Sequence, residues 1–271
     1  MKAKVLYSIS LLVFVIVIVV FYFIAKNAQS SADNLQYNYN IYVINLARRR
    51  DRMVKFGANY QLGPQYKILD AVDGKTLNID DLVVSGKVGS IAVESIRNVE
   101  SGKGRKHHYE IGTIGAIGCS LSHIKVWQEA RMNEKPTIVF EDDAIVSGIQ
   151  MKEINNRVNS LPDDWHIYLL GRPHTMYTGI RVGDNLVKVQ RFCGLHAYVI
   201  NKTGAELLLQ KGKLFPINQQ VDSHLSELCL DHGLNVYSHT NFPMYFAGDN
   251  TTDIQVVNEI GTLDDARLKI E

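Results

Sequence analysis

Three consecutive acidic residues, Glu141-Asp142-Asp143, follow the apolar run Thr137–Phe140. Adjacent carboxylates repel one another and raise one another's pKa unless a cation lies between them. Mg²⁺ or Mn²⁺ relieves this repulsion, because both ions bind one or two carboxylates together with phosphate oxygens. The triplet therefore predicts a divalent-metal site that holds a diphosphate, with a solvated turn or a helix cap as the alternative.

Other polar side chains stand at the ends of apolar runs. Asn45 lies in Ile41–Leu46, and Asp70 and Asp73 follow Tyr66–Leu69. Ligands of open α/β sheets bind at the carboxyl ends of the strands, so we expect these side chains to lie near the acidic triplet.

Cys119 and His123 are four residues apart on a predicted helix. Such spacing could pair a nucleophile with a base, or His123 could orient a neighbouring carboxylate. Gly112, Gly115 and Gly118 recur every three residues, and we expect them to allow close packing at the start of this helix. The chain has no GxxxxGKS, HExxH or GxSxG motif, so the common phosphate, zinc and hydrolase signatures are missing.

The elements that must position these residues alternate between strands and helices. This alternation predicts an α/β fold with a mixed, mostly parallel sheet flanked by helices. A Thr203-Gly-Ala-Glu206 capping box predicts where one helix begins. Residues 83–110 are expected to be loops with one short helix at most. Predicted strands are 41–46, 66–69, 137–140, 166–170, 186–190, 197–200 and 234–237, and predicted helices begin at 49, 118, 203 and 221.

Length and charge limit the class of protein. The 271 residues leave room for one membrane element and one catalytic domain. With 29 basic and 28 acidic residues the net charge is +1, which argues against a nucleic-acid partner. The three cysteines lack the spacing of a zinc site and are expected to be buried thiols.

Residues 5–25 contain no charge and would form a helix about 32 Å long, which matches a bilayer core. We expect a single-pass transmembrane signal-anchor at 1–26, a polar stem at 27–40, a catalytic domain at 41–256 and a tail at 257–271. A cleaved signal peptide is the alternative. Basic residues before the apolar run favour a cytosolic N-terminus, hence a type II protein with its catalytic domain in the lumen of the ER or Golgi. A bacterial protein would need that domain on the cytoplasmic face.

Five segments occur in a specific order: INLARRRDR (44–52), AVDG (71–74), GAIGCSLSH (115–123) with Trp127, FEDDA (140–144) and GLHAY (194–198). Together they resemble glycosyltransferase family 25, which includes lipooligosaccharide and procollagen galactosyltransferases. The resemblance covers about residues 41 to 254. It implies a GT-A type fold, a UDP-sugar donor, most often UDP-galactose, and inverting transfer of a hexose to a glycan, lipooligosaccharide or glycoprotein hydroxyl. Ala116 stands where many members carry Glu.

The resemblance also implies roles for single residues. Asp143 corresponds to the direct ligand of Mn²⁺ or Mg²⁺ and Glu141 to the other end of the metal motif, with Glu141 or Asp142 facing the ribose or sugar. His196 would contact the diphosphate or the metal, with a core histidine as the alternative. Further donor-binding candidates are Asn45, Arg49, Arg52 and Asp73, and for the two arginines the alternative is a solvated basic helix start.

Inverting transfer needs a base for the acceptor hydroxyl. We predict Asp222, at the start of a helix, for this role, with an N-cap as its alternative and His224 as the second candidate base. Two other functions stay open: an inactive, membrane-tethered carbohydrate-binding or chaperone-like protein, and a metal-dependent phosphohydrolase. The sequons at Asn201 and Asn250 would suit a lumen.

Overall fold

The computed structural model describes residues 15–23, 39–171, 177–241, 245–246 and 254. The chain divides into two compact units, Met1–Asn38 and Tyr39–Glu271. In the first unit, the described residues form a helix at 15–23. Within the described parts of the chain, no helix has both the length and the apolar character that crossing a membrane requires. The other residues of the expected 5–25 span, residues 27–38 of the stem, Asn250 and the 257–271 tail lie outside the described residues.

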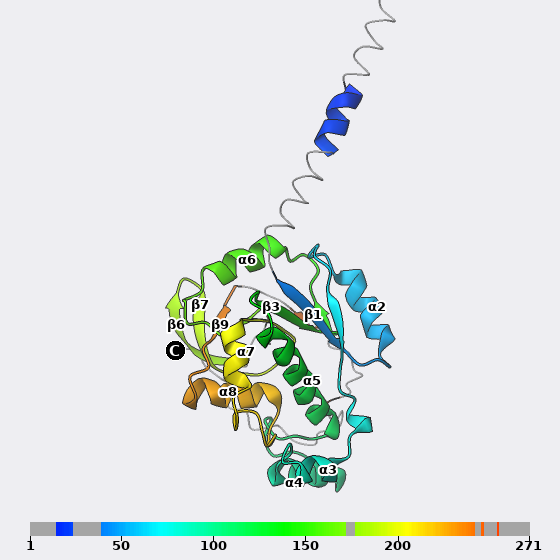
Figure 1. Ribbon diagram of the computed structural model, residues 1–271, viewed down its shortest axis with the longest axis vertical. Helices are drawn as coiled ribbons and strands as arrows, with labels where there is room; N and C mark the ends of the chain where they lie inside the picture. Colours follow the sequence, from blue (N-terminus) through cyan, green and yellow to red (C-terminus); the bar gives the residue numbers. More distant parts are fainter. Residues whose placement is uncertain (1–14, 24–38, 172–176, 242–244, 247–253, 255–271) are drawn as a thin grey trace, which may run out of the picture. The chain divides into compact units, whose positions relative to one another are not determined.

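An eight-stranded sheet forms the centre of the Tyr39–Glu271 unit (Figure 1). Its strand order is β2-β1-β3-β8-β5-β9-β7-β6. A separate antiparallel pair joins β4 (Ala144–Ile145) to β10 (Tyr245–Phe246). The strands of the large sheet are β1 (Asn40–Asn45), β2 (Lys67–Asp70), β3 (Thr137–Glu141), β5 (Ile167–Leu169), β6 (Tyr177–Gly183), β7 (Leu186–Phe192), β8 (Ala197–Ile200) and β9 (Val236–His239).

The strand directions confirm a mixed sheet. β1 is parallel to β2 and β3, and β5 is parallel to β9. β8 is antiparallel to β3 and β5, and β7 is antiparallel to β9 and β6. Six strands therefore share one direction and β7 and β8 oppose it, but most neighbouring pairs are antiparallel. The expectation of a mostly parallel sheet thus holds for strand direction and is wrong for pairing.

Helices cover the two faces of the sheet. α5 (Ile114–Arg131), α7 (Lys202–Leu208) and α8 (Val221–Asp231) pack on one face, where they share a core with the strands. α2 (Arg50–Asn59) contributes Phe56, whose ring centroid lies 5.8 Å from that of Phe140 in β3. Val139 belongs to the α5 side, and successive strand residues point to opposite faces, so α2 lies on the other face. The remaining elements are η1 (Gly74–Thr76), α3 (Ile79–Val84), α4 (Ser90–Glu100) and α6 (Met151–Asn159).

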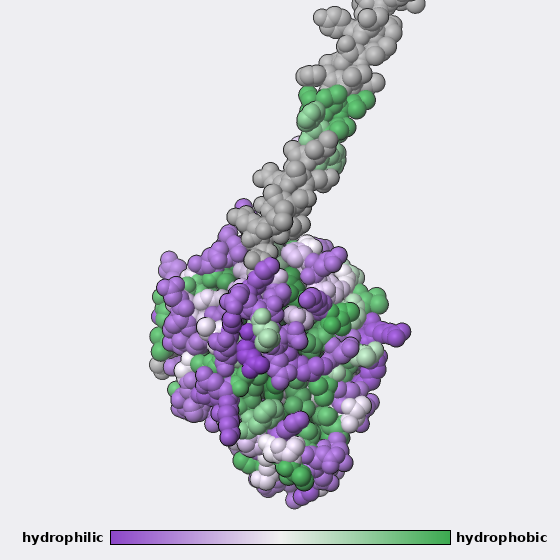
Figure 2. Space-filling view, viewed as in Figure 1, coloured by the Kyte–Doolittle hydropathy of each residue, from purple (hydrophilic) through white to green (hydrophobic). Residues whose placement is uncertain are grey.

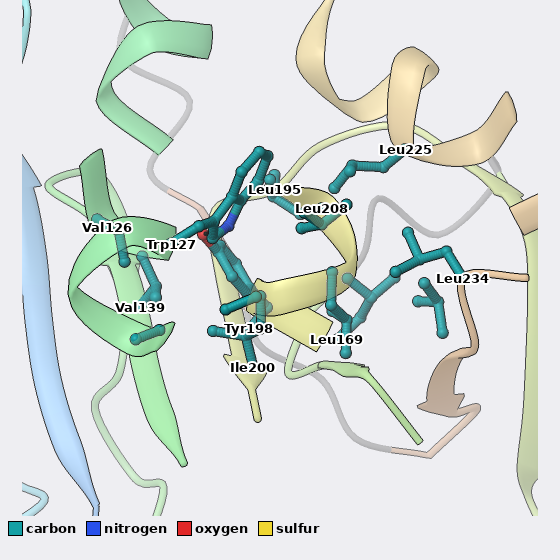
Figure 3. Packing of buried hydrophobic residues seen from close by; sticks show 14 of the residues in the cluster. Val126, Trp127, Val139, Leu169, Leu195, Tyr198, Ile200, Leu208, Leu225 and Leu234 are labelled. Atoms are coloured by element: carbon teal, nitrogen blue, oxygen red, sulfur yellow. Dashed lines mark hydrogen bonds between the residues drawn. The ribbon is translucent and has the colours of Figure 1, made fainter. Parts of the chain in front are cut away.

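Trp127 of α5 lies at the centre of the main core and is fully buried (Figure 3). Its indole lies against Tyr198 and Leu195, and Leu208 of α7 and Leu225 of α8 complete the same cluster (Figure 3). Burying an apolar side chain of this size stabilises the fold by roughly 2–3 kcal/mol. The core therefore fixes α5 against β8, the strand that begins directly after His196.

A second, smaller core joins α3 and α4 to the start of α5. It contains Leu82, Ala92, Ile96 and Ile117. The helix α4 spans 11 residues inside the stretch expected to be mainly loops. Residues 83–110 therefore hold more helical structure than expected. The helix is stabilised by one short apolar face, on which Ala92 and Ile96 recur at helical spacing.

Close backbone contact joins α5 to the turn after β2, and glycines make it possible. A Cβ atom at Gly118 would lie 2.5 Å from the carbonyl oxygen of Val72, and one at Gly74 would lie 2.7 Å from the Cα of Gly115. The expectation of close packing by the spaced glycines is thus confirmed at Gly115 and Gly118. The contact places the AVDG and GAIGC segments side by side.

The element boundaries differ from the expectations at two helix starts. Helix α5 begins at Ile114, with Thr113 as its N-cap, rather than near Gly118. Helix α7 is capped by Asn201, whose Oδ1 accepts from the backbone N–H of Gly204 at 2.7 Å, so the predicted capping box at Thr203 is wrong. Thr203 instead donates its hydroxyl to Asn201.

Candidate functional site

The candidate site lies where β1, β2 and β3 end. These strands are parallel, so Asn45, Asp70 and Glu141 stand at the same edge of the sheet. His196 joins them because β8 runs antiparallel to β3, and the Glu141 backbone N–H donates to the His196 carbonyl oxygen at 2.8 Å. The expectation that the polar residues after the strands gather at the carboxyl edge is confirmed for these segments.

Asp142 is turned into the protein and held from both sides. Asn45 Nδ2 donates to its Oδ2 atom at 2.6 Å, and Arg52 Nη1 donates to its Oδ1 atom at 2.9 Å. Burial raises the pKa of the Asp142 carboxyl, while the hydrogen bonds from Arg52 and Asn45 act in the opposite direction. Asp142 therefore ties the acidic turn to β1 and α2, and both of its oxygens are engaged within the protein.

Glu141 lies between two histidines. His123 Nε2 is 3.1 Å from its Oε1 atom, and His196 Nδ1 is 3.1 Å from its Oε2 atom. Burial would raise the pKa of the Glu141 carboxyl, but His196 and His123 together hold it well below its usual range. For His196, burial would lower the imidazole pKa, and Glu141 and Asp143 raise it well above its ordinary value. Glu141 is therefore an ionised carboxylate at neutral pH.

A buried hydrogen-bond chain extends behind Glu141. Tyr198 Oη lies 3.0 Å from His123 Nδ1 and accepts from Trp127 Nε1 at 2.9 Å. Trp127, Tyr198 and His123 are all buried. The chain fixes the ring of His123, so its other nitrogen faces Glu141. This confirms the interpretation in which His123 orients a neighbouring carboxylate.

Asp143 is the acidic residue with an unsatisfied atom. Its Oδ1 atom is buried and receives no hydrogen bond from the described residues, and its nearest charged neighbour is His196 Nδ1 at 3.4 Å. Arg52 Nη1 lies 4.0 Å from its Oδ2 atom. His196 at 3.4 Å offsets part of the cost of burying this carboxylate oxygen, and a bound cation would stabilise the oxygen further.

Glu141, Asp143 and His196 each offer one ligand atom, and these atoms lie within 4.8 Å of one another. Two neighbouring carboxylates suit Mg²⁺ or Mn²⁺, which are bound by few protein ligands together with substrate phosphates. The residues present therefore fit a divalent metal. A second set within the same distance, Cys119, His123 and Glu141, shares Glu141. Burial raises the pKa of the Cys119 thiol well above its usual value, which disfavours both a thiolate ligand and a cysteine nucleophile.

The remaining donor-side candidates have partners of their own. Arg49 forms a two-point ion pair with Asp51, with distances of 3.0 and 2.9 Å. Asp73 accepts from Arg48 Nε at 2.7 Å and from the Lys75 backbone N–H at 3.0 Å, and the Arg48 hydrogen bond lowers the pKa of Asp73. Arg52 is thus the predicted arginine that contacts the acidic turn, whereas Arg49 contacts its own helix.

Asp222 is the second residue of α8 and is buried. Its Oδ2 atom accepts from the Gly194 backbone N–H at 2.6 Å, and its Oδ1 atom accepts from the Ser223 N–H at 2.8 Å. Gly194 has a φ of +86°, a left-handed conformation that favours glycine. The carboxylate therefore fixes the turn that leads to His196. The N-cap of α8 is Gln220, so the alternative of Asp222 as the N-cap is wrong.

His224 lies two residues further along α8, on a different side of the helix. It lines a small apolar pocket between α5 and α8, together with Trp127, Leu214 and Leu225. Figure 2 shows hydrophobic residues gathered over this part of the visible face, in contrast to the hydrophilic upper part. Burial lowers the pKa of His224. The two candidate bases are thus separated, with Asp222 at the Gly194 turn and His224 in an apolar pocket.

Sequence reasoning gave no role to Tyr198 or to Arg48. Tyr198 lies in the quoted GLHAY segment, and a buried tyrosine hydroxyl needs a partner, which was the available signal. Its partners are 75 and 71 residues away, at His123 and Trp127, and no local pattern identifies them. Arg48 is one of three consecutive arginines, and spacing alone does not separate them.

The sequence profile of "Glycosyltransferase family 25 (LPS biosynthesis protein)" matches residues 38–225. The chain is 29% identical over 210 residues to "Procollagen galactosyltransferase 1-A" of Xenopus laevis, covering 73% of this chain and 32% of that protein. It is 30% identical over 193 residues to "Procollagen galactosyltransferase 2" of Homo sapiens, covering 66% and 29%.

The chain therefore spans about a third of the length of these curated relatives. Among solved structures, the apo form of mouse xyloside xylosyltransferase 1 gives a TM-score of 0.38 at 8% identity, over 73% of this chain and 83% of that one. A similarity at that level supports no argument about fold or function.

Proposed function

The chain belongs to glycosyltransferase family 25, and on that premise we propose that residues 41–256 form a GT-A type domain that transfers a hexose from a UDP-sugar to an acceptor hydroxyl. The names of the relatives, procollagen galactosyltransferases, favour galactose from UDP-galactose. One observation carries the proposal: Glu141, Asp143 and His196 converge at the carboxyl edge of the sheet around a buried Asp143 oxygen that receives no hydrogen bond.

Glu141 and Asp143 would hold a divalent ion in this arrangement. A bound Mn²⁺ or Mg²⁺ supplies positive charge that stabilises the departing diphosphate. His123 and His196 fix the Glu141 carboxylate at 3.1 Å on each side. These two contacts fix the orientation of the carboxylate, which lowers the reorganisation needed to hold the ion.

Arg52 is the side chain best placed to add positive charge on the donor side. It lies 2.9 Å from Asp142 and 4.0 Å from Asp143, and Asn45 braces the same Asp142 carboxylate. We infer that Asn45 and Asp142 position Arg52 for the nucleotide diphosphate. Arg49 and Asp73 remain predicted donor contacts at the adjoining helix start and turn.

Inverting transfer requires a base on the face of the sugar opposite the leaving UDP. Asp222 remains our prediction for this base, and His224 remains the second candidate. The hydrogen bond from Gly194 to Asp222 favours the first, since it connects Asp222 to the segment that carries His196.

The acceptor is proposed to be a hydroxyl of a glycan, a lipooligosaccharide or a glycoprotein. The single-pass anchor, its type II orientation and the lumenal position of the domain stay predictions from residues 1–40. The cytoplasmic position of the domain in a bacterial host also stays a prediction.

Release of UDP from UDP-galactose tests the function, with and without Mn²⁺ and with and without a mixture of glycan acceptors. We expect turnover that needs the metal, rises with acceptor and is lost in Asp143→Ala. Asp163→Ala, at an exposed residue, is the matched control and should match wild type. Metal-independent turnover would contradict the proposal. Release of inorganic phosphate would favour the phosphohydrolase, and UDP binding without turnover would favour the inactive carbohydrate-binding protein.

A further inference from the structure

The segment between α4 and α5 carries a local surplus of positive charge. Residues 103–110 read KGRKHHYE and contain Lys103, Arg105 and Lys106 against the single acid Glu110. The whole chain has a net charge of only +1, so this surplus is a feature of the segment and not of the composition.

Internal hydrogen bonds give the segment a defined shape. Glu110 Oε2 accepts from the backbone N–H groups of Lys106 and His107 at 2.7 and 3.3 Å. Arg105 Nη1 donates to the carbonyl oxygens of His108 and Glu110, each at 3.1 Å. The acid and the arginine are therefore both used to fold the loop, and neither neutralises the two lysines.

The same loop carries two aromatic rings that stack on each other. The rings of His107 and Tyr109 are stacked, with centroids 5.1 Å apart and planes 10° apart. Both residues are exposed, as are Lys103 and Lys106. No ion pair joins either lysine to another residue in the described part of the chain. The surface formed by Lys103, Lys106, His107 and Tyr109 is called the 103–109 surface below.

Two connections join the 103–109 surface to helices that carry residues of the candidate site. Gln220 donates its side-chain amide to the carbonyl oxygen of His108 at 2.7 Å, and its backbone N–H donates to Tyr109 at 2.9 Å. Gln220 caps α8 two residues before Asp222. On the other side the segment leads through Thr113 into α5, which carries His123. The surface therefore borders the elements that hold both the predicted base and the Glu141 carboxylate.

We propose that the 103–109 surface binds an acidic saccharide, whose ring packs against the exposed side chains of His107 and Tyr109 and whose carboxylate or phosphate group pairs with Lys103 and Lys106. Sugar rings offer apolar C–H faces to stacked aromatic side chains, and lysine ammonium groups attract anions at the surface. The role of this saccharide as the acceptor rests on the proposed function. Its binding to the surface is independent of that function.

The test measures binding to the full chain by isothermal titration calorimetry with two matched probe pairs. One pair is a hyaluronan hexasaccharide and its carboxyl-reduced form, and the other is pentamannose monophosphate and its dephosphorylated form. The charged member of at least one pair should bind more tightly, and the two pairs distinguish a carboxylate from a phosphate ligand. The difference should shrink as salt is raised from about 0.05 to 0.5 M.

Variants identify the surface. Lys103→Ser with Lys106→Ser should weaken the charged probe about tenfold and leave the uncharged one unchanged. Tyr109→Ala should weaken both members of the pair, and Lys106→Arg should keep most of the binding. The control, Lys152→Ser, changes an exposed lysine on α6, at the opposite end of this unit from α3 and α4 (Figure 1). Thermal unfolding confirms that each variant is folded.

Equal or absent binding of the charged and uncharged probes by wild type would overturn the inference, and so would lysine variants that bind as wild type does. Binding to anionic vesicles but to neither oligosaccharide would assign the surface to a membrane instead. Metal-dependent UDP release from UDP-galactose is measured on the same samples. If that activity is present while saccharide binding fails, only this inference is wrong; the reverse result would leave the surface in place and remove the proposed function.

Discussion

His123 Nε2 lies 3.1 Å from Glu141 Oε1, so a buried histidine of α5 holds a carboxylate of the acidic turn after β3. The other nitrogen of the same ring contacts Tyr198, which also binds Trp127. The core of the domain thus extends through hydrogen bonds to the candidate metal site, and a change in the core should be measurable at the site.

Tyr198→Phe tests this connection. The substitution removes one hydroxyl and leaves Trp127 Nε1 and His123 Nδ1 buried without their partner. We expect the free energy of unfolding to fall by about 1–3 kcal/mol and the affinity for Mn²⁺ to fall as well. Urea unfolding and metal titration measure the two effects. The control Tyr66→Phe, at a partly exposed residue, should change neither quantity. An unaffected Mn²⁺ affinity in Tyr198→Phe would show that the Trp127–Tyr198–His123 hydrogen bonds do not influence the metal site.

The two predicted arginines should differ in their effect on stability. Arg52→Met removes the partner of Asp142, a pair whose side chains are only 13% and 8% exposed, and should cost about 3 kcal/mol or more. Arg49→Met breaks a pair in which Asp51 is 54% exposed, so it should lower the free energy of unfolding much less than Arg52→Met does. Equal losses of unfolding free energy in the two variants, measured in urea, would show that the Arg52–Asp142 contact stabilises the fold no more than the Arg49–Asp51 pair.

Gly118 should not tolerate a side chain. A Cβ atom there would lie 2.5 Å from the Val72 carbonyl oxygen, and the neighbouring backbone must shift to admit it. We expect Gly118→Ala to destabilise the protein by about 1–3 kcal/mol. Gly183→Ala is the matched control, because its Cβ atom would meet Leu186 at an ordinary 3.7 Å. Similar melting temperatures for the two variants would be inconsistent with a close contact at Gly118.

We expect His166 to make the stability of the protein depend on pH. The Asn235 backbone N–H donates to its Nδ1 atom at 3.0 Å, which requires the neutral ring at that nitrogen, and burial lowers the pKa of His166. The unfolded chain binds the proton near pH 6.5, and the folded chain binds it only at lower pH. This contribution is therefore present above about pH 6.5 and is lost as pH falls through the folded pKa.

The comparison of wild type with His166→Asn isolates that contribution, since an asparagine oxygen can accept the same N–H without titrating. Urea unfolding at pH 7.5 and at pH 5.5 should show a smaller loss of stability at acid pH in the variant. If the free energy of unfolding changes with pH in the same way for the two proteins, His166 does not contribute to the pH dependence of stability.

The sequence predicted those parts of the fold that depend on local pattern. The strand at 137–140 and the acids after it were found because an apolar run ends at a polar turn. The sheet edge brought Asn45 and Asp142 together as expected from parallel strands. The cap of α7 was misassigned, because both Asn201 and Thr203 have capping side chains and only the backbone geometry selects Asn201.

The parts that were missed depend on contacts between distant segments. The direction of β8 follows from its pairing with β3 and β5, which no residue within Ala197–Ile200 indicates. In the same way, the different partners of Asp142 and Asp143 depend on how the turn is oriented against α2 and β8. The triplet pattern alone does not distinguish the three acidic residues as candidate metal ligands. The fold distinguishes them because each residue has different contacts.

The most direct test of the metal site is calorimetric binding of UDP in the presence and absence of Mn²⁺. Wild type and Asp163→Ala should bind UDP far more tightly with Mn²⁺ than without it. Asp143→Ala should lose this difference while its unfolding remains cooperative. If UDP binds wild type equally well with and without Mn²⁺, or if Asp143→Ala retains the full effect of the metal, then Glu141 and Asp143 do not form the proposed metal site.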